Sequence, residues 1–273
     1  MTDLLKVDFK RFFKDKLLIV IAILSVVLGA ISPLLTGLLT KPFGDLLSIL
    51  GMQFTAKHQF FSAFSYSNNM GLIAPILIAI VITKDFRYGT VRNKIISGKS
   101  RKSIYLSMFT TCATMLFAVM LLSALIAMIV GLMFFPFQDT PFDAAALQHF
   151  VLSLALELLF YLFISAILCY LCATAKNLGL VIILYVAIIM LFDIVSVSLQ
   201  VALTILAYDQ SKEIALKIAD FIQNINVFSY STVIGSGTEY ETSKLIYMLV
   251  TPTVFTSLLI LLGIRTFNRK DLK

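Results

Sequence analysis

The tripeptide Gly98-Lys99-Ser100 has the composition with which a phosphate-binding loop of nucleotide-binding proteins ends. Such a loop has another glycine five residues before the second one, because its backbone N–H groups must wrap around the phosphates. Asn93 occupies that position in this chain. The loop must also follow a buried strand and open a helix, and residues 84–103, between two apolar stretches, are too few to form such a fold. The sequence therefore predicts that this segment binds no nucleotide.

The cysteines and histidines could in principle form redox or metal sites. Cys169 and Cys172 have the C-x-x-C spacing of such sites, but they lie in an apolar stretch without a second pair or a nearby histidine, so we interpret them as packing residues. The chain has only two histidines, His58 and His149. Because they are far apart in the sequence, they cannot form a H-E-x-x-H zinc site. The chain also lacks a Gly-x-Ser-x-Gly nucleophile elbow. We therefore predict no metal site and no catalytic residue.

Polar side chains inside apolar stretches form a second group of candidates. A charge at the centre of a bilayer costs about 2.5–3.5 kcal/mol on insertion scales, so each such residue needs a reason. The candidates, several of them three or four residues apart, are Ser62, Ser65, Asn69, Glu157, Asp193, Ser196, Gln200 and Thr204. They either line a substrate path or form hydrogen bonds between helices that hold a bundle or a dimer together. The sequence leaves both interpretations open.

The composition is that of an integral membrane protein. Of 273 residues, 59% are hydrophobic and 14% are charged, whereas about 25% of the residues are charged in soluble domains. A helix needs about 20 apolar residues to cross a bilayer. We therefore predict an all-α fold, a single transmembrane domain over residues 1–273. The six predicted spans are residues 17–39, 60–82, 105–135, 149–175, 178–206 and 244–267.

The basic residues indicate the orientation of the chain. Most of its 22 Lys and Arg residues lie near the N-terminus, in residues 84–103 and at the C-terminus. Since cytoplasmic loops carry the excess of Lys and Arg, we expect both termini to be cytoplasmic. The net charge of +7 then reflects topology and not nucleic-acid binding. A secretory signal peptide is the competing interpretation of the first apolar run, but that run is long enough to span a membrane.

Two segments outside the spans have helical patterns. Residues 1–16 place Leu5, Phe9, Phe12 and Phe13 on one face and predict an interfacial helix, with an ordinary solvated amphipathic tail as the alternative. Residues 208–243 repeat isoleucine at helical spacing until glycines break the pattern near residue 235. We expect one or two short helices there, covering the outer ends of the spans.

The segment DFRYGTVRNKIISGKSRKS, residues 85–103, also predicts a short amphipathic helix. Tyr88, Val91 and Ile95 would form one apolar ridge with basic residues beside it. Gly98 suits the left-handed conformation that ends a helix, and Ser100 suits the N-cap of the next one. Such a helix either docks in a groove of a cytosolic partner or binds anionic lipid.

This segment resembles the coupling loop of type-2 ABC exporter permeases, in which an acid is followed by Gly-Thr-Leu, a Leu pair and a Ser-Arg. The matching residues are Asp85, Gly89, Thr90, Val91, Ile95, Ser97, Ser100 and Arg101. Arg87, Lys94 and Gly98 depart from that pattern. The resemblance extends to the arrangement of the whole chain: an amphipathic first helix, six spans, and an outer helical segment before the last span.

The resemblance implies a non-catalytic permease subunit in a bacterial cytoplasmic membrane. Its coupling residues would be Asp85, Gly89, Thr90, Val91, Ile95, Ser100, Arg101 and, in a second contact, Lys176. They would dock on a separate ATPase, which would hold ATP and Mg, so this chain would need no cofactor. A second copy or a homologue would complete the pore, with spans two and five at the dimer interface. The Phe-rich, Trp-free composition favours hydrophobic or amphipathic cargo, peptide above all.

Other functions remain open on the sequence alone. A proton-coupled secondary carrier would use Glu157 and Asp193 as its relay. A sensor or an immunity protein could also have the same permease architecture.

Overall fold

The computed structural model describes residues 2–40, 54–66, 68–138, 143–175, 177–206, 213–236 and 240–270. Within these ranges the secondary structure is helical, with no strand. The helices are α1 (Thr2–Lys14), α2 (Lys16–Thr40), α4 (Ala56–Phe64), α5 (Asn69–Arg87), α6 (Thr90–Ile96), α7 (Arg101–Gly131), α8 (Ala144–Thr174), α9 (Leu178–Leu206), α10 (Glu213–Ile225), α11 (Val227–Ser236) and α12 (Thr242–Arg269). The predicted all-α fold is confirmed.

Five helices in the described part of the chain are long and apolar enough to cross a membrane: α2, α7, α8, α9 and α12. A helix can cross because it satisfies its own backbone hydrogen bonds, which lipid cannot do. Their outward faces are apolar, as Ile183, Met190 and Ile194 of α9 show by being largely exposed. The chain is therefore a multi-pass membrane protein.

The prediction of one continuous helix over residues 60–82 was wrong. The structure has two helices there, α4 and α5, with a turn between them. Ser65 leaves the helical conformation at ψ 132°, and the Asn68 side chain donates a hydrogen bond to the Ser62 carbonyl at 3.2 Å. Short polar side chains of this kind compete with helical backbone bonding. The turn also crosses close over Gly71, where a Cβ atom would lie 2.3 Å from the Ser65 carbonyl oxygen.

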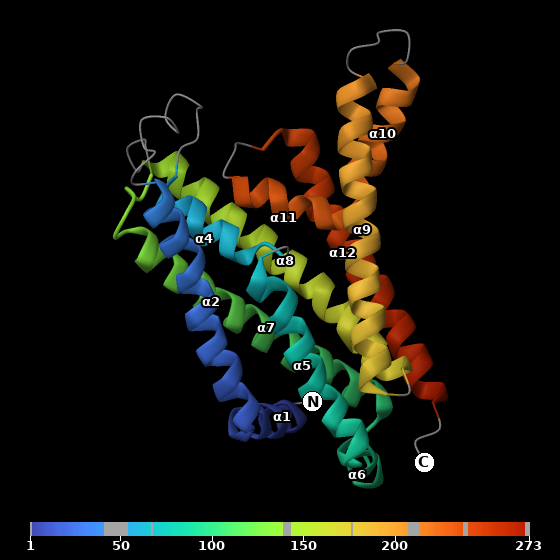
Figure 1. The fold of residues 1–273 in the computed structure, drawn as a ribbon. Coiled ribbons are helices and arrows are strands. Elements are labelled where there is room, and N and C mark those ends of the chain that lie inside the picture. The colour runs from blue at the N-terminus through green and yellow to red at the C-terminus, as the bar shows by residue number, and fades with distance from the viewer. Residues whose placement is uncertain are drawn as a thin grey trace.

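Figure 1 shows both ends of the chain and α6 at one end of the bundle, and α10 and α11 toward the other. Two predicted helical segments are confirmed. The N-terminal segment is α1, and the segment before the last span contains two helices, α10 and α11.

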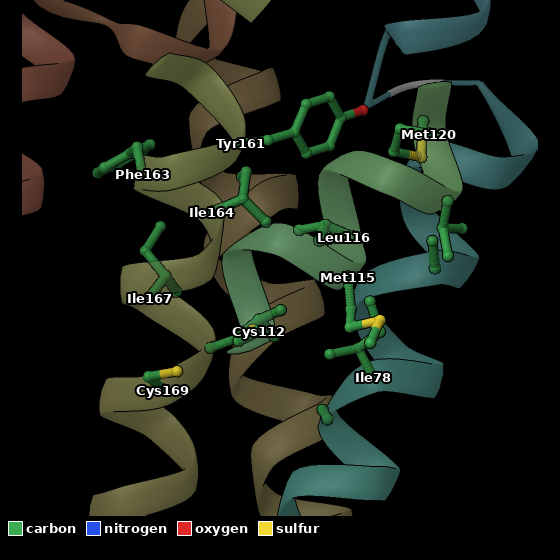
Figure 2. Packing of buried hydrophobic residues seen from close by; sticks show 14 of the residues in the cluster. Ile78, Cys112, Met115, Leu116, Met120, Tyr161, Phe163, Ile164, Ile167 and Cys169 are labelled. Atoms are coloured by element: carbon green, nitrogen blue, oxygen red, sulfur yellow. The ribbon is translucent and has the colours of Figure 1, made fainter. Parts of the chain in front are cut away.

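The core lies around α7 and α8, which pack against each other, while α2 packs on α7 and α12 packs on α8. Figure 2 shows Leu116 and Met120 of α7 facing Tyr161 and Ile164 of α8. On α2, small residues recur every four positions and allow α7 to approach closely. A Cβ atom on Gly29 would lie 2.5 Å from the Ser123 carbonyl oxygen, so this helix contact requires glycine.

Candidate functional site

Helix α6 is fixed at both ends by the backbone of the connection between α5 and α7. Gly89, with φ +70°, sits between α5 and α6. At the other end Gly98, with φ +80°, follows α6, and its N–H donates to the Ile95 carbonyl while that of Lys99 donates to the Lys94 carbonyl. These two bonds form a Schellman motif, which ends a helix.

The next helix begins directly after this motif. The Ser100 hydroxyl accepts a hydrogen bond from the Ser103 N–H at 3.2 Å and thereby caps α7. The predicted left-handed cap at Gly98 and the predicted N-cap at Ser100 are both confirmed. These two caps define where α6 ends and where α7 begins.

The predicted apolar ridge of Tyr88, Val91 and Ile95 is divided between two sides of this segment. Val91 is only 3% exposed, and Ile95 packs against the core. Tyr88 is 71% exposed. The sequence analysis missed Ile96, which is 73% exposed. The apolar side chains that α6 and its flanks offer to a partner are therefore Tyr88 and Ile96, beside the exposed Arg92 and Lys99.

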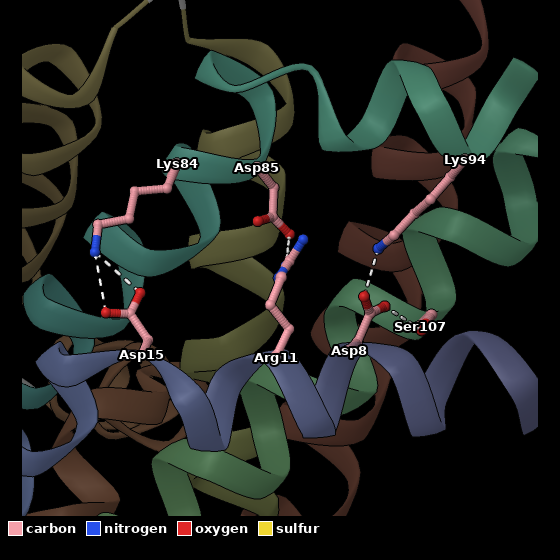
Figure 3. A network of polar contacts seen from close by, with 7 residues as sticks. All are labelled: Asp8, Arg11, Asp15, Lys84, Asp85, Lys94 and Ser107. Carbon is pink, nitrogen blue, oxygen red and sulfur yellow. Dashed lines mark hydrogen bonds and ion pairs between the residues drawn. The ribbon is translucent and has the colours of Figure 1, made fainter.

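Three ion pairs attach the N-terminal segment, α1 and the residue after it, to the end of α5 and to α6, and Figure 3 shows them side by side. Lys94 of α6 contacts Asp8 at 2.5 Å, and Lys84 of α5 contacts Asp15 at 2.9 Å. Between them Arg11 donates a hydrogen bond to Asp85. Of these residues, the sequence analysis had selected only Asp85 as a candidate. Its partner is a residue of this chain, so Asp85 positions the loop.

The electrostatics of the three aspartates differ. Asp8 is buried and also accepts a hydrogen bond from the Ser107 hydroxyl at 2.7 Å. Burial raises the pKa of the Asp85 carboxyl, and the Arg11 guanidinium offsets only part of that rise. Partial burial raises the pKa of Asp15, but the hydrogen bonds from the Leu17 N–H and the Lys84 ammonium lower it by more. The pKa of Asp15 is therefore below its usual value.

Arg101, predicted to contact a partner, instead binds the end of another helix. Its guanidinium donates to the carbonyls of Phe267, Asn268 and Lys270 at 3.2, 3.0 and 2.7 Å. A cation here complements the partial negative charge at the C-terminus of α12. Lys270 in turn donates to the Ala173 carbonyl at the end of α8 at 2.7 Å. Lys176 lies outside the described residues.

Three other predicted coupling residues begin or cap helices in the structure. Gly89 provides the left-handed N-cap of α6, Thr90 begins that helix, and Ser100 caps α7. These three residues shape the loop.

The acidic residues of the bundle are in different environments. Asp193 of α9 accepts a hydrogen bond from the Tyr66 hydroxyl in the turn after α4. Glu157 of α8 is fully buried, and neither of its carboxyl oxygens has a hydrogen-bond partner among the described residues. In that part of the chain no contact joins Glu157 to Asp193.

The remaining polar candidates lie on two helices: Ser196, Gln200 and Thr204 follow Asp193 along one face of α9, and Ser62 and Ser65 belong to α4 and its end. Ser196 and Gln200 line a polar pocket of about 390 Å³ at the end where α10 and α11 lie. Thr204 is exposed and donates to the Gln200 carbonyl of its own helix at 2.9 Å. The side chain of Asn69 lies outside the described part of the structure.

The described residues contain no group of three His, Cys, Asp or Glu side chains close enough to hold a metal ion. Cys112, Cys169 and Cys172 are free and buried.

Comparison with known proteins places the chain in a family. No curated protein matches the sequence. One family model matches residues 17–273, and its description is "protein of unknown function (DUF2705)". Since this match covers nearly the whole chain, the protein belongs to the DUF2705 family.

Proposed function

We propose that this protein is the membrane-spanning subunit of an ATP-driven exporter. A separate ATPase docks on the end of the bundle that carries α6, and ATP and Mg bind to that partner. Two copies, or one copy and a homologue, form the complete permease in a bacterial cytoplasmic membrane. The cargo is hydrophobic or amphipathic, with a peptide as the favoured class.

The observation that carries this proposal is the way α6 is mounted. Lys94 ties α6 to Asp8 of α1, and glycines with positive φ precede and follow α6. Two further ion pairs tie the adjoining end of α5 to the same N-terminal segment, so a push on α6 would be passed on to α1 and α5. The loop around α6 also exposes Tyr88 and Ile96, two large apolar side chains, beside the exposed basic residues Arg92 and Lys99. A partner that pushes on this surface would transmit force directly to α5 and α7.

A six-span arrangement with cytoplasmic termini is part of the proposal. Five helices have the length and composition of spans, and the pair α4–α5 returns the chain from the far end of α2 to the end that carries α6 (Figure 1). Helix α5 has 19 residues, which corresponds to about 28 Å at 1.5 Å per residue. That length is close to the hydrocarbon thickness of about 30 Å.

A second candidate is a proton-coupled carrier, and the buried, unpartnered carboxyl of Glu157 is the observation in its favour. Its relay would require a path from Glu157 to Asp193, and the described residues offer no contact between them. The exporter proposal accounts for α6 and its mounting, which a carrier does not need.

Transport by inverted membrane vesicles separates the two functions. The vesicles contain this chain together with the ATPase that co-purifies with it, and uptake of a hydrophobic labelled peptide is followed with ATP, without ATP, and with a protonophore. The exporter proposal predicts uptake that requires ATP and survives the protonophore. Uptake that persists without ATP and stops with the protonophore would contradict it and favour the carrier.

A further inference from the structure

Helix α1 lies at the level where the chain enters the membrane. Only Asp15 separates α1 from α2, and its carboxylate and backbone carbonyl accept hydrogen bonds from the N–H groups of Leu17 and Leu18 at 3.0 and 2.9 Å. The exposed apolar side chains of α2 begin at Ile19, about one helical turn later. Figure 1 shows α1 lying across this end of α2 and not continuing along it. The whole of α1 therefore stays near the membrane surface.

One side of α1 is attached to the rest of the protein. Leu4, Asp8 and Phe12, at every fourth position, are buried. Asp8, Arg11 and, directly after α1, Asp15 form the ion pairs with α5 and α6, so their charges are neutralised within the protein (Figure 3). Phe12, one of the four residues on the predicted interfacial face, is thus used for packing inside the bundle.

The other side of α1, which we call its free side, has an apolar row beside a basic row. Leu5 and Phe9 are half-buried and Phe13 is 66% exposed, and residues four positions apart are neighbours on a helix surface. The residue that follows each of them is an exposed lysine: Lys6, Lys10 and Lys14. The two rows therefore run next to each other along the helix.

The free side has a surplus of positive charge. Its three lysines form no ion pair with another described residue. Asp3 is exposed near the start of α1, and Lys16 is exposed just after its end. With the three ion pairs set aside, four lysines and one aspartate remain, which is a surplus of three positive charges.

This arrangement suits the boundary of a bilayer that contains anionic lipid. Apolar side chains on such a helix enter the region between headgroups and acyl chains. Lysines beside them reach the headgroups, because their long apolar stems lie along the surface while the ammonium groups stay in the polar layer. The surplus of positive charge is attracted to anionic headgroups.

We propose that the free side of α1 binds anionic phospholipid: Leu5, Phe9 and Phe13 contact the acyl chains, and the ammonium groups of Lys6, Lys10 and Lys14 bind the headgroup phosphates. The inference depends on the place of α1 at the membrane surface and not on the exporter function.

Because the chain contains no tryptophan, a single introduced one reports on nearby lipid. Phe13→Trp places the reporter on the free side of α1, and Ile183→Trp places a control on the exposed apolar face of α9. Each purified full-length variant is reconstituted in phosphatidylcholine nanodiscs with a fixed fraction of brominated phosphatidylglycerol or brominated phosphatidylcholine. The bromine lies high on one acyl chain and quenches nearby tryptophan. The ratio of quenching by the two lipids measures lipid preference independently of the depth of the reporter.

The proposal predicts stronger quenching by phosphatidylglycerol than by phosphatidylcholine at Phe13→Trp, and equal quenching by the two lipids at Ile183→Trp. In the Phe13→Trp background, Lys10→Gln should lower the affinity for phosphatidylglycerol relative to phosphatidylcholine about fivefold, the contribution of one lysine near an anionic surface. The triple variant Lys6→Gln, Lys10→Gln, Lys14→Gln should abolish the preference.

Two further triple variants in the same background serve as controls. Arginine at positions 6, 10 and 14 should keep the preference, which separates loss of charge from loss of structure. The combination of Arg92→Gln, Lys99→Gln and Lys102→Gln removes three exposed basic residues at the same end of the molecule but outside α1, and it should also keep the preference.

Three results would overturn the proposal. Equal quenching of Phe13→Trp by the two lipids would mean that α1 does not select anionic lipid. A preference that survives the glutamine substitutions on α1 and disappears with those at positions 92, 99 and 102 would assign the lipid to the loop around α6. Quenching of Phe13→Trp by aqueous acrylamide and by neither lipid would mean that the free side faces water. Each readout is independent of ATP and of transport, so a failure here is separate from a failure of the exporter proposal.

Discussion

Asp8 and Lys94, 86 residues apart in the chain, form an ion pair of 2.5 Å inside the protein, where the side chain of Asp8 is 5% exposed and that of Lys94 is 11% exposed. The first helix of the chain is thereby attached to α6. Any force on α6 reaches α1, and through it the beginning of α2.

Removing one partner of this pair should destabilise the protein strongly. Asp8→Asn leaves the Lys94 ammonium buried beside a neutral amide, and breaking a buried pair in this way typically costs about 3–5 kcal/mol. Denaturation followed in detergent should show that the free energy of unfolding is lower by this amount. The double variant with Asn at position 8 and Met at position 94 should recover part of it, because no charge then remains buried. Equal stability of Asp8→Asn and the exposed control Asp3→Asn would contradict the assigned contact.

Because of the ion pair between Lys84 and Asp15, the free energy of unfolding should fall as the pH is lowered into the acid range. The folded-state pKa of Asp15 lies below its ordinary value of 3.8, so its contribution is complete above that value and is lost as the pH falls through the folded-state pKa. Thermal unfolding measured from neutral pH to about pH 3 should therefore show a smaller acid-side loss for Asp15→Asn than for the wild type. If the unfolding temperatures of the two proteins fell equally with pH, ionisation of the Asp15 carboxylate would not contribute to stability.

The conformation of Gly89 should tolerate no ordinary side chain. Its φ of +70° costs other residues roughly 1–2 kcal/mol, although an added Cβ atom would meet nothing within 4 Å. Gly89→Ala should thus lower the unfolding free energy by about that amount, and Gly89→Asn by less, because Asn accepts the left-handed region. Gly179→Ala, in the first turn of α9 and without a positive φ, is the matched control and should be neutral or stabilising. A neutral Gly89→Ala would refute the left-handed turn.

The hydrogen bond between Tyr66 and Asp193 should stabilise the contact of the α4–α5 turn with α9. Tyr66→Phe removes a hydroxyl donor to a carboxylate, which is worth about 1.5–3 kcal/mol. A double-mutant cycle with Asp193→Asn measures the coupling, and Tyr88→Phe, at an exposed tyrosine, is the control. Additive effects of the two substitutions would mean that the bond does not exist.

Local features of the fold could be predicted from the sequence because they depend on neighbouring residues. Long apolar runs predicted the long helices, and Gly98 and Ser100 predicted the two caps, since each acts through its own backbone or side chain. The face of α6 could not be predicted by the same reasoning. A continuous helix from Asp85 would place Tyr88 and Val91 on one side, but the left-handed Gly89 interrupts the helix, so the two side chains lie on different sides.

Contacts between segments far apart in the chain could not be predicted from the sequence either. Asp8 and Lys94 each resemble an ordinary solvated charge, and only the packing of α1 against the loop reveals their pairing. Arg101 matched a motif, yet its donors bind the carbonyls of α12, which no spacing in the loop indicates. The break at Ser65 was missed because the polar residues around it were interpreted as a path lining or as hydrogen bonds between helices, and not as a turn.

These corrections change which substitution best tests the coupling surface. Charge reversal at Arg101 would damage the end of α12 as well as any partner contact. Ile96 is exposed and supports no other helix, so Ile96→Glu should leave stability within about 0.5 kcal/mol of the wild type. Val7→Glu, at a similarly exposed apolar residue on α1, is its matched control.

The most direct test of the exporter proposal is the recovery of an ATPase with this protein. The tagged wild type, Ile96→Glu and Val7→Glu are expressed in the native host and purified in mild detergent, and stoichiometric partners are identified by mass spectrometry. We predict a cytosolic ATPase with the wild type and with Val7→Glu, and its loss with Ile96→Glu at unchanged stability. Purification of the wild type without any ATPase, or equal recovery of the ATPase with Ile96→Glu, would contradict the claim that α6 is its docking surface.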